Sequence, residues 1–102
     1  MSRALVVERH GDMRNVLCNL LIGMGIDTID VKAVEEININ DYDFDIIISN
    51  ANAIRYLTKY HIPILALTPL MREDENDISY IRQPFEVNDF RNKIESLLQA
   101  HV

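Results

Sequence analysis

The run Asp45-Ile46-Ile47-Ile48-Ser49-Asn50 is the feature that most constrains the fold of this chain. Its three isoleucines form a short, β-branched stretch without charge, which is typical of a strand that is buried on both faces. Such a strand lies in the middle of a parallel sheet with helices on both sides. In open sheets of this kind, ligands bind beyond the carboxyl ends of the strands. Asn50 therefore marks the edge of the sheet at which we expect function.

The rest of the chain alternates between apolar runs and segments with helical spacing, which predicts a parallel α/β sheet with right-handed crossovers. Strands are predicted at residues 4–7, 26–31, 45–50, 61–68 and 78–82. The first helix is predicted from Met13 to Met24, with Asp12 as N-cap and Gly25 as stop. A short helical turn at 33–37 is followed by a linker through Asp43, and one or two turns over 53–60 have Ile54 and Leu57 facing inward. The last helix begins at Glu86 or Asn88. Residues 69–77 are predicted to be a loop.

Composition sets the broad class of the protein. The length of 102 residues fits a single domain over residues 1–102. The net charge of −6 argues against a nucleic-acid partner and favours a basic partner surface. Cys18 is the only cysteine and cannot form an internal disulfide, and neither a signal-peptide pattern nor an apolar run of membrane length is present. We therefore expect a cytoplasmic domain without membrane contact.

Polar residues follow four of the predicted strands: Glu8-Arg9, Asn50, Thr68 and Gln83-Pro84-Phe85. From about Arg3 to Leu98, this pattern resembles the receiver domain of two-component response regulators and hybrid histidine kinases. The resemblance implies a CheY-like, flavodoxin-like doubly wound sheet of five parallel strands in the order 2-1-3-4-5. In that family, an acidic pair after strand one holds magnesium and an aspartate closing strand three accepts a phosphoryl group. A Ser or Thr ends strand four, and a lysine precedes a cis-proline after strand five.

This chain departs from the family pattern at three of the five positions, so Glu8, Arg9, Asn50, Thr68 and Gln83 are interpreted as a degenerate phosphoacceptor pocket. The amide of Asn50 is a poor nucleophile and offers no charge to a hard cation. Arg9 stands in place of an acidic ligand and would repel Mg²⁺, and Gln83 lacks the countercharge of lysine. We expect no catalytic residue, no metal, no cofactor and no enzymatic activity.

The segment before the last strand is shorter than the family usually shows, which predicts that helix four is shortened or lost. Tyr80 falls at the position of the family's switch aromatic residue. We expect an interaction surface here, in which Leu70, Met71 or Tyr80 exposes apolar surface as an anchor inside an acidic rim, and charge steers the contact towards a basic partner. The rim consists of Glu73, Asp74, Glu75 and Asp77.

The leading hypothesis is a receiver-like signalling module that acts by protein contact, without phosphorylation, in a two-component or phosphorelay system. Its partner would be a histidine kinase, a phosphotransfer domain, an output domain or a neighbouring domain of its own chain, and a homodimer stays open. One alternative is a small anion- or nucleotide-binding domain that uses Arg9 and helix N-termini, although no Gly-rich loop supports it. Another is a phosphocarrier or enzyme that uses His10 or Cys18, for which no supporting constellation is evident.

Overall fold

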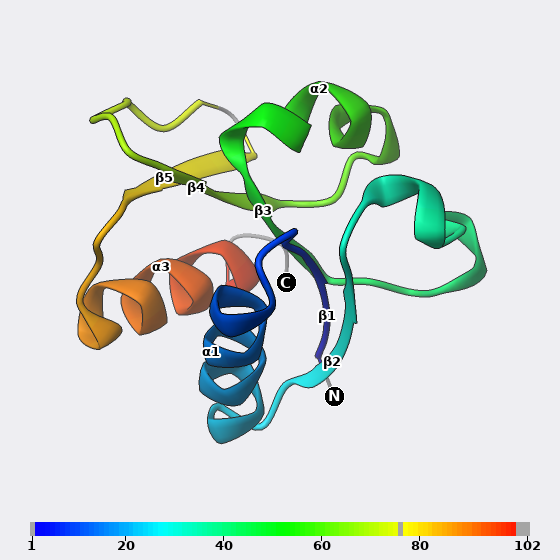
Figure 1. The fold of residues 1–102 in the computed structure, drawn as a ribbon, viewed down its shortest axis with the longest axis horizontal. Coiled ribbons are helices and arrows are strands. Elements are labelled where there is room, and N and C mark those ends of the chain that lie inside the picture. Colours follow the sequence, from blue (N-terminus) through cyan, green and yellow to red (C-terminus); the bar gives the residue numbers. More distant parts are fainter. Residues whose placement is uncertain (1, 76, 100–102) are drawn as a thin grey trace.

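The computed structural model describes residues 2–75 and 77–99 and contains one sheet of five parallel strands in the order β2-β1-β3-β4-β5 (Figure 1). The strands are β1 (Arg3–Val7), β2 (Asp27–Val31), β3 (Ile46–Asn50), β4 (Ile64–Thr68) and β5 (Ile78–Arg82). The helices are α1 (Gly11–Gly23), α2 (Ile54–Leu57) and α3 (Val87–Gln99). This order and the parallel pairing confirm the predicted doubly wound sheet.

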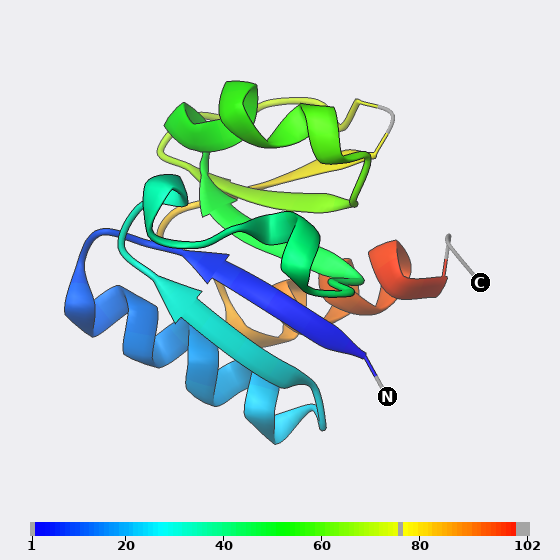
Figure 2. The same cartoon turned by 90° about the vertical axis from the view of Figure 1, so that its right-hand side faces the viewer.

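Two layers of helical structure cover the sheet, one on each face (Figures 1 and 2). Helices α1 and α3 lie on one face, where they bury Ile46 and Ile48 of β3. The other face is covered by α2 and by short 3-10 turns, which bury Ile47. The isoleucine run is therefore buried from both sides, as its composition predicts.

Helix α1 begins two residues before the predicted start and ends at Gly23, one residue before the predicted end. The N-cap is His10, whose carbonyl accepts the Arg14 N–H at 2.9 Å, so Asp12 lies inside the first turn and its predicted capping role is wrong. At the other end, Gly25 has φ of +80° and Ile26 N–H returns to the Leu21 carbonyl at 3.0 Å. This closure needs a left-handed residue, which explains the glycine.

The second helical layer is built mostly from 3-10 turns. The predicted turn at 33–37 is a 3-10 helix over Val34–Glu36, and the linker after it holds another over Ile39–Asp41. A 3-10 turn over Ala51–Ala53 follows β3 directly, and a further one over Thr58–Tyr60 follows α2. Leu57 is fully buried and Ile54 packs against the same core cluster, so both face inward as predicted.

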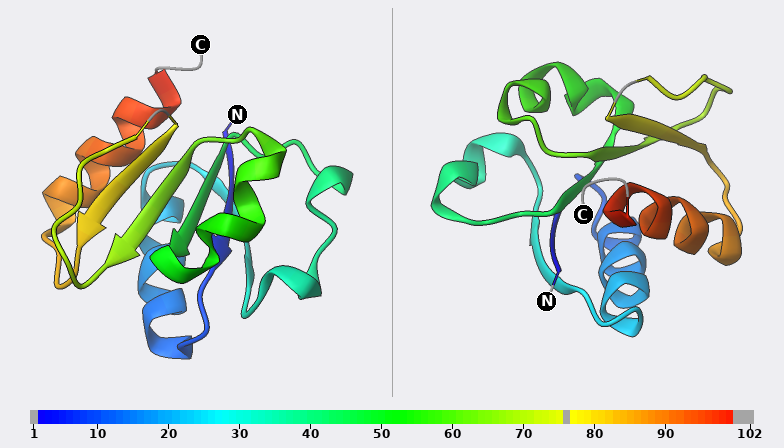
Figure 3. Two further views of the ribbon diagram at one scale, coloured as in Figure 1. Left: turned by 90° about the horizontal axis from the view of Figure 1, so that it is seen from above. Right: turned by 180° about the vertical axis from the view of Figure 1, so that it is seen from behind.

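The connection from β4 to β5 contains no helix among its described residues, 69–75 and 77. The predicted loop and the predicted loss of helix four are therefore confirmed. Seen from above, β5 is the outermost strand on this side of the sheet (Figure 3). The last helix begins at Val87, between the two predicted starts, and buries Phe90, Ile94 and Leu97.

Replacing Phe90 with Ala should destabilise the fold by about 3–5 kcal/mol, because the ring is fully buried between α3 and the sheet and truncation leaves a cavity. Urea denaturation followed by circular dichroism measures this free energy. Val87→Ala is the matched control on the same helix, since Val87 is exposed and should cost far less. Equal losses in the two variants would contradict the assigned packing of α3.

Candidate functional site

A cavity of about 820 Å³ lies beyond the carboxyl ends of β1, β3 and β4. Parallel strands end at the same edge of the sheet, so residues far apart in the sequence meet there. Four of the five predicted pocket residues line the cavity: Glu8, Asn50, Thr68 and Gln83. The remaining lining is His10, Asp12, Met13, Ala51, Asn52, Leu67, Pro69, Leu70 and Arg72.

Arg9 is the predicted pocket residue that does not line the cavity. The chain leaves β1 with Glu8 buried and Arg9 exposed to solvent. The expectation that Arg9 places a cation at the site is therefore wrong. A different cation, Arg72 of the β4–β5 loop, lines the cavity instead. Sequence reasoning misses Arg72 because five acidic or amide residues follow it directly, and the whole segment has the composition of a solvated loop.

Glu8 is 5 % exposed and is held by its own turn. Its Oε1 accepts the His10 N–H at 3.0 Å, and its backbone carbonyl accepts from Arg14 Nη1 at 3.0 Å. Arg14 also donates through Nε to Asp30 at 3.1 Å. The Glu8 carboxylate thus already has a hydrogen-bond donor and serves to shape the turn between β1 and α1.

Asn50 closes β3 and presents a buried amide oxygen, Oδ1, that has no hydrogen-bond partner among the described residues. An unsatisfied buried acceptor costs about 1–3 kcal/mol, so this carboxamide is held here by the strand rather than by polar contacts. Beside it, Thr68 Oγ1 accepts the Leu70 N–H at 3.2 Å. The Gln83 N–H donates to the Thr68 carbonyl at 2.8 Å, and the Gln83–Pro84 peptide bond is cis, as the resemblance implied.

This donor set does not fit the magnesium ion that the resemblance would imply. No three His, Cys, Asp or Glu side chains gather as a metal-binding group within the described residues. Two carboxylates line the cavity, those of Glu8, which is engaged in its turn, and of Asp12. Asn50 contributes a neutral amide, and Arg72 brings a positive charge to the same cavity. Mg²⁺ binds chiefly through carboxylates and phosphate oxygens, which this cavity does not supply in sufficient number.

The loop that replaces helix four is tied to Tyr80 of β5 by two contacts. The Arg72 guanidinium lies over the Tyr80 ring at 4.4 Å from its centroid, and Asp74 Oδ1 accepts the Tyr80 N–H at 2.9 Å. Asp74 also faces Lys93 of α3, with Nζ at 3.8 Å from Oδ2. We call Arg72, Asp74, Tyr80 and Lys93 the loop clamp.

The clamp overturns one part of the predicted interaction surface. Tyr80 is only 5 % exposed, because the loop folds back over its ring, so of the three candidate anchors Tyr80 is the one that the structure excludes. Leu70 and Met71 are 69 % and 77 % exposed, as expected once helix four is lost. Glu73, Asp74, Glu75 and Asp77 are all exposed, and Asp74 is in addition a member of the clamp.

The two residues behind the phosphocarrier or enzyme alternative lie in different surroundings. His10 is exposed at the start of α1 and lines the cavity. Cys18 of α1 packs against the core. Burial and the nearby charge of Asp30 raise the pKa of its thiol, and the charge of Arg14 offsets part of this rise. A raised pKa reduces the thiolate fraction, so Cys18 is a poor nucleophile.

Asp74→Ala should speed hydrogen exchange of the Tyr80 amide by about tenfold, because this amide loses a charged acceptor. Two-dimensional NMR in deuterated buffer measures the rate. Glu73→Ala is the matched control, since Glu73 is an exposed neighbour of the same charge. Unchanged exchange in Asp74→Ala would show that the loop does not hold β5 in this way.

A second prediction separates Arg72 from Arg9 as the cation that affects the cavity. In an Asn50→Asp background, Arg72→Gln should tighten Mg²⁺ binding by roughly fivefold, which corresponds to about 1 kcal/mol of relieved repulsion in water. Arg9→Gln in the same background should change it much less, because Arg9 lies outside the cavity.

Isothermal titration with MgCl₂ measures both affinities, and circular dichroism checks that each variant is folded. The Asn50→Asp single variant should stay weak, because Arg72 and a neutral Gln83 remain. A larger gain from Arg9→Gln than from Arg72→Gln would contradict the placement of the two arginines.

None of the helices that the structure describes has the length and apolar character needed to cross a bilayer.

Comparisons with known proteins find likeness in structure rather than in sequence. No family model matches the sequence, and no curated protein does. Among solved structures, the chemotaxis protein CheY4 of Vibrio cholerae matches with a TM-score of 0.80 at 20% identity, over 96% of this chain and 99% of that one. The response regulator TrrA of Thermotoga maritima, solved in complex with Mg²⁺-BeF, matches with a TM-score of 0.76 at 24% identity, over 96% of this chain and 100% of that one. A sensor protein from Polaromonas sp. JS666 matches with a TM-score of 0.81 at 14% identity, over 99% of this chain and 98% of that one.

These matches cover nearly the whole of both chains, and the sheet order is the one that the resemblance implied. Together with the polar residues at the ends of β1, β3, β4 and β5, they show that this chain has the fold of a response-regulator receiver domain.

Proposed function

We propose that this chain is a receiver-like signalling module of a two-component or phosphorelay system that acts by protein contact and takes up no phosphoryl group. The observation that carries the proposal is Asn50. Its carboxamide closes β3 and lines the cavity at the position where the receiver family places its phosphoacceptor aspartate.

The chemistry of the cavity supports this proposal residue by residue. Formation of an acyl phosphate needs a carboxylate nucleophile, and an amide oxygen does not replace it. Gln83 is neutral, so a transferred phosphoryl group would lack the countercharge that a lysine supplies at this position in the family. The altered nucleophile, the poor metal fit and the missing countercharge act on the same reaction, and repairing any one of them leaves the others in place.

The loop clamp supports an interaction surface whose conformation stays the same without phosphorylation. In receiver domains, the residue pair that corresponds to Thr68 and Tyr80 couples phosphorylation to the output face. Here Thr68 is already bonded to the loop through the Leu70 N–H, and Tyr80 is covered by Arg72. A coupling pair that is fixed by its own loop suits a module whose surface does not depend on phosphorylation.

The partners that suit such a module are those of the sequence hypothesis: a histidine kinase, a phosphotransfer domain, an output domain or a neighbouring domain of the same chain. Leu70 and Met71 offer apolar surface of the kind that interfaces bury. The charge around them is mixed, because exposed Glu73 and Glu75 lie in the same loop as Arg72. The acidic residues alone favour a basic partner, whereas the mixed charge of the loop also suits a partner that carries carboxylates.

A small-anion binder is the second candidate, and it rests on Arg72 rather than on Arg9. Arg72 lines the cavity beside Thr68, and no carboxylate among the described residues forms an ion pair with it. Titration with inorganic phosphate, followed by NMR, separates the candidates. Saturable shifts at Ala51 and Thr68 would favour anion binding in the cavity, and their absence would favour the contact module.

Incubation with acetyl phosphate and Mg²⁺ should leave the intact mass of this protein unchanged. The expected result follows from Asn50 and Gln83, which remove the nucleophile and the countercharge. A response regulator with the complete acidic pocket, treated in the same mixture, is the positive control and should gain one phosphoryl group. A phosphoryl adduct on this protein that maps to the cavity would overturn the proposed function.

A further inference from the structure

The edge of β5 is half closed by the protein itself. Ile64 N–H donates to the Asp77 carbonyl, and Gln83 N–H donates to the Thr68 carbonyl. The backbone N–H and carbonyl groups of the odd-numbered residues of β5 therefore point towards β4. Ile78, Tyr80 and Arg82 therefore turn their backbone groups outward. The loop closes the first part of this edge, because Glu75 and Ile78 exchange backbone hydrogen bonds and Asp74 accepts the Tyr80 N–H.

Three outward backbone groups remain after this closure: the carbonyl of Tyr80 and the N–H and carbonyl of Arg82. None of them has a hydrogen-bond partner in the part of the chain that the structure describes. They follow one another along one side of the strand, which is the arrangement that allows an added strand to form backbone hydrogen bonds. Beyond them, Pro84 has no N–H to offer and ends the edge.

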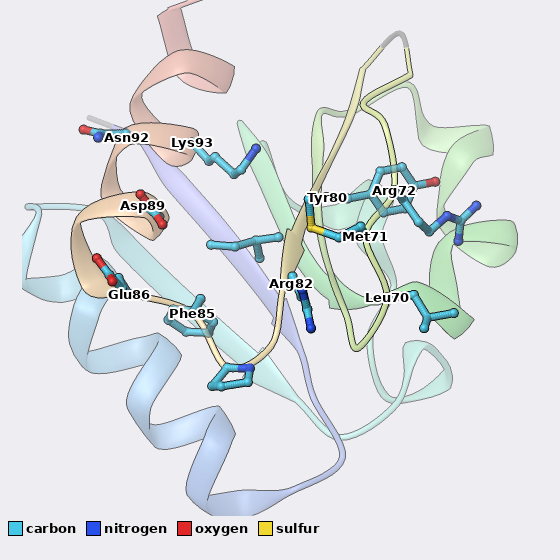
Figure 4. Close-up of a pocket in the computed structure, with 12 residues that line it drawn as sticks. Leu70, Met71, Arg72, Tyr80, Arg82, Phe85, Glu86, Asp89, Asn92 and Lys93 are labelled. Carbon is cyan, nitrogen blue, oxygen red and sulfur yellow. The ribbon is translucent and has the colours of Figure 1, made fainter.

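These groups face a groove of about 570 Å³ between the β4–β5 loop and α3 (Figure 4). One side carries the exposed Leu70 and Met71, and the other carries Phe85 and the first turns of α3. Figure 4 shows Arg82 projecting from β5 between Phe85 and Leu70. The groove therefore offers apolar contact on both sides of the unpaired backbone.

The charges of the groove select the chemistry of its occupant. Arg72, Arg82 and Lys93 line it together with Glu86 and Asp89. Lys93 already faces Asp74 of the loop, whereas no carboxylate among the described residues pairs with Arg72 or Arg82. The two unpaired arginines flank the open edge in a chain whose net charge is −6. This excess of local positive charge complements an occupant that carries carboxylates.

We infer that the free edge of β5 binds an extended segment of a partner protein as a sixth strand, with one or two carboxylates of that segment placed against Arg72 and Arg82. The inference rests on the proposed function, since it names the kind of partner that the contact module takes. The overall negative charge opposes a polyacidic tail at long range, so the occupant is an apolar, β-branched strand with few acidic residues.

The test uses an acetylated and amidated heptapeptide, Thr-Val-Glu-Val-Glu-Val-Thr, titrated into the ¹⁵N-labelled protein. Its two glutamates lie on one face of an extended chain, about 7 Å apart. At saturation, exchange of the Arg82 amide should slow by about tenfold, because this N–H gains a backbone acceptor. A peptide with lysines in place of the glutamates and a peptide N-methylated at every internal residue should both bind at least about tenfold more weakly.

Arg82→Glu should weaken binding of the acidic peptide by about tenfold. Arg55→Glu is the matched control, because Arg55 is exposed on α2, stacks on Tyr56 and does not line the groove. Both variants change the net charge equally, so a difference between them isolates the groove. Equal weakening in the two variants would overturn the inference.

Three further results would also overturn the inference. These are equal binding of the lysine or N-methylated peptide, amide shifts confined to α1 or α2, and concentration-dependent protection of the Arg82 amide in the free protein, which would make a second copy the occupant. Failure of peptide binding leaves the proposed function intact. Phosphoryl uptake from acetyl phosphate overturns the proposed function whatever the peptide does, so the two failures are distinguishable.

Discussion

Burial of β3 on both faces is the constraint on which the rest of this structure depends. Ile46, Ile47 and Ile48 are fully buried, and each such side chain contributes about 1.5–3 kcal/mol relative to an exposed one. Together they contribute roughly 5–9 kcal/mol, which is comparable to the whole stability of a typical domain. That gain requires a layer on each side of the sheet. The thin layer of α2 and 3-10 turns is therefore as necessary to the fold as α1 and α3.

The same constraint positions the cavity. A strand that is buried along its length presents a polar side chain to solvent only where it leaves the core, and in β3 this residue is Asn50, because the polar Ser49 before it is fully buried. Parallel pairing then brings the ends of β1 and β4 alongside, so Glu8 and Thr68 join it from distant parts of the sequence. The fold thus sets the geometry of this strand-end cavity whatever residue stands at position 50. Chemistry at that position is open to change because the packing of the core does not depend on it.

Sequence reasoning predicted the strands, the two long helices and the loop over 69–77, since each rests on local periodicity or on turn residues. It also placed Glu8, Asn50, Thr68 and Gln83 at one edge, because strand ends in a parallel sheet meet there. Apart from the N-cap, which is His10 and not Asp12, the errors concern side-chain direction. Arg9 turns to solvent beside a buried Glu8, and Tyr80 is covered by a residue eight positions earlier. Neither fact follows from periodicity, because the turn between β1 and α1 decides the first and the folding of the β4–β5 loop over the sheet decides the second.

The loss of helix four has two consequences that act in opposite directions on the same strand. The loop that remains is long enough to fold over Tyr80 and to close the first part of the β5 edge through Asp74 and the Glu75–Ile78 bridge. It is too short to cover the rest, so the backbone of Arg82 stays without a partner among the described residues. Exposed strand edges are usually protected by charge, by proline or by covering segments. Here Arg82 and Pro84 supply the first two, which discourages pairing with an arbitrary strand while leaving room for one whose carboxylates match the arginine. Under the proposed function, this strand edge is what selects the partner of the contact module.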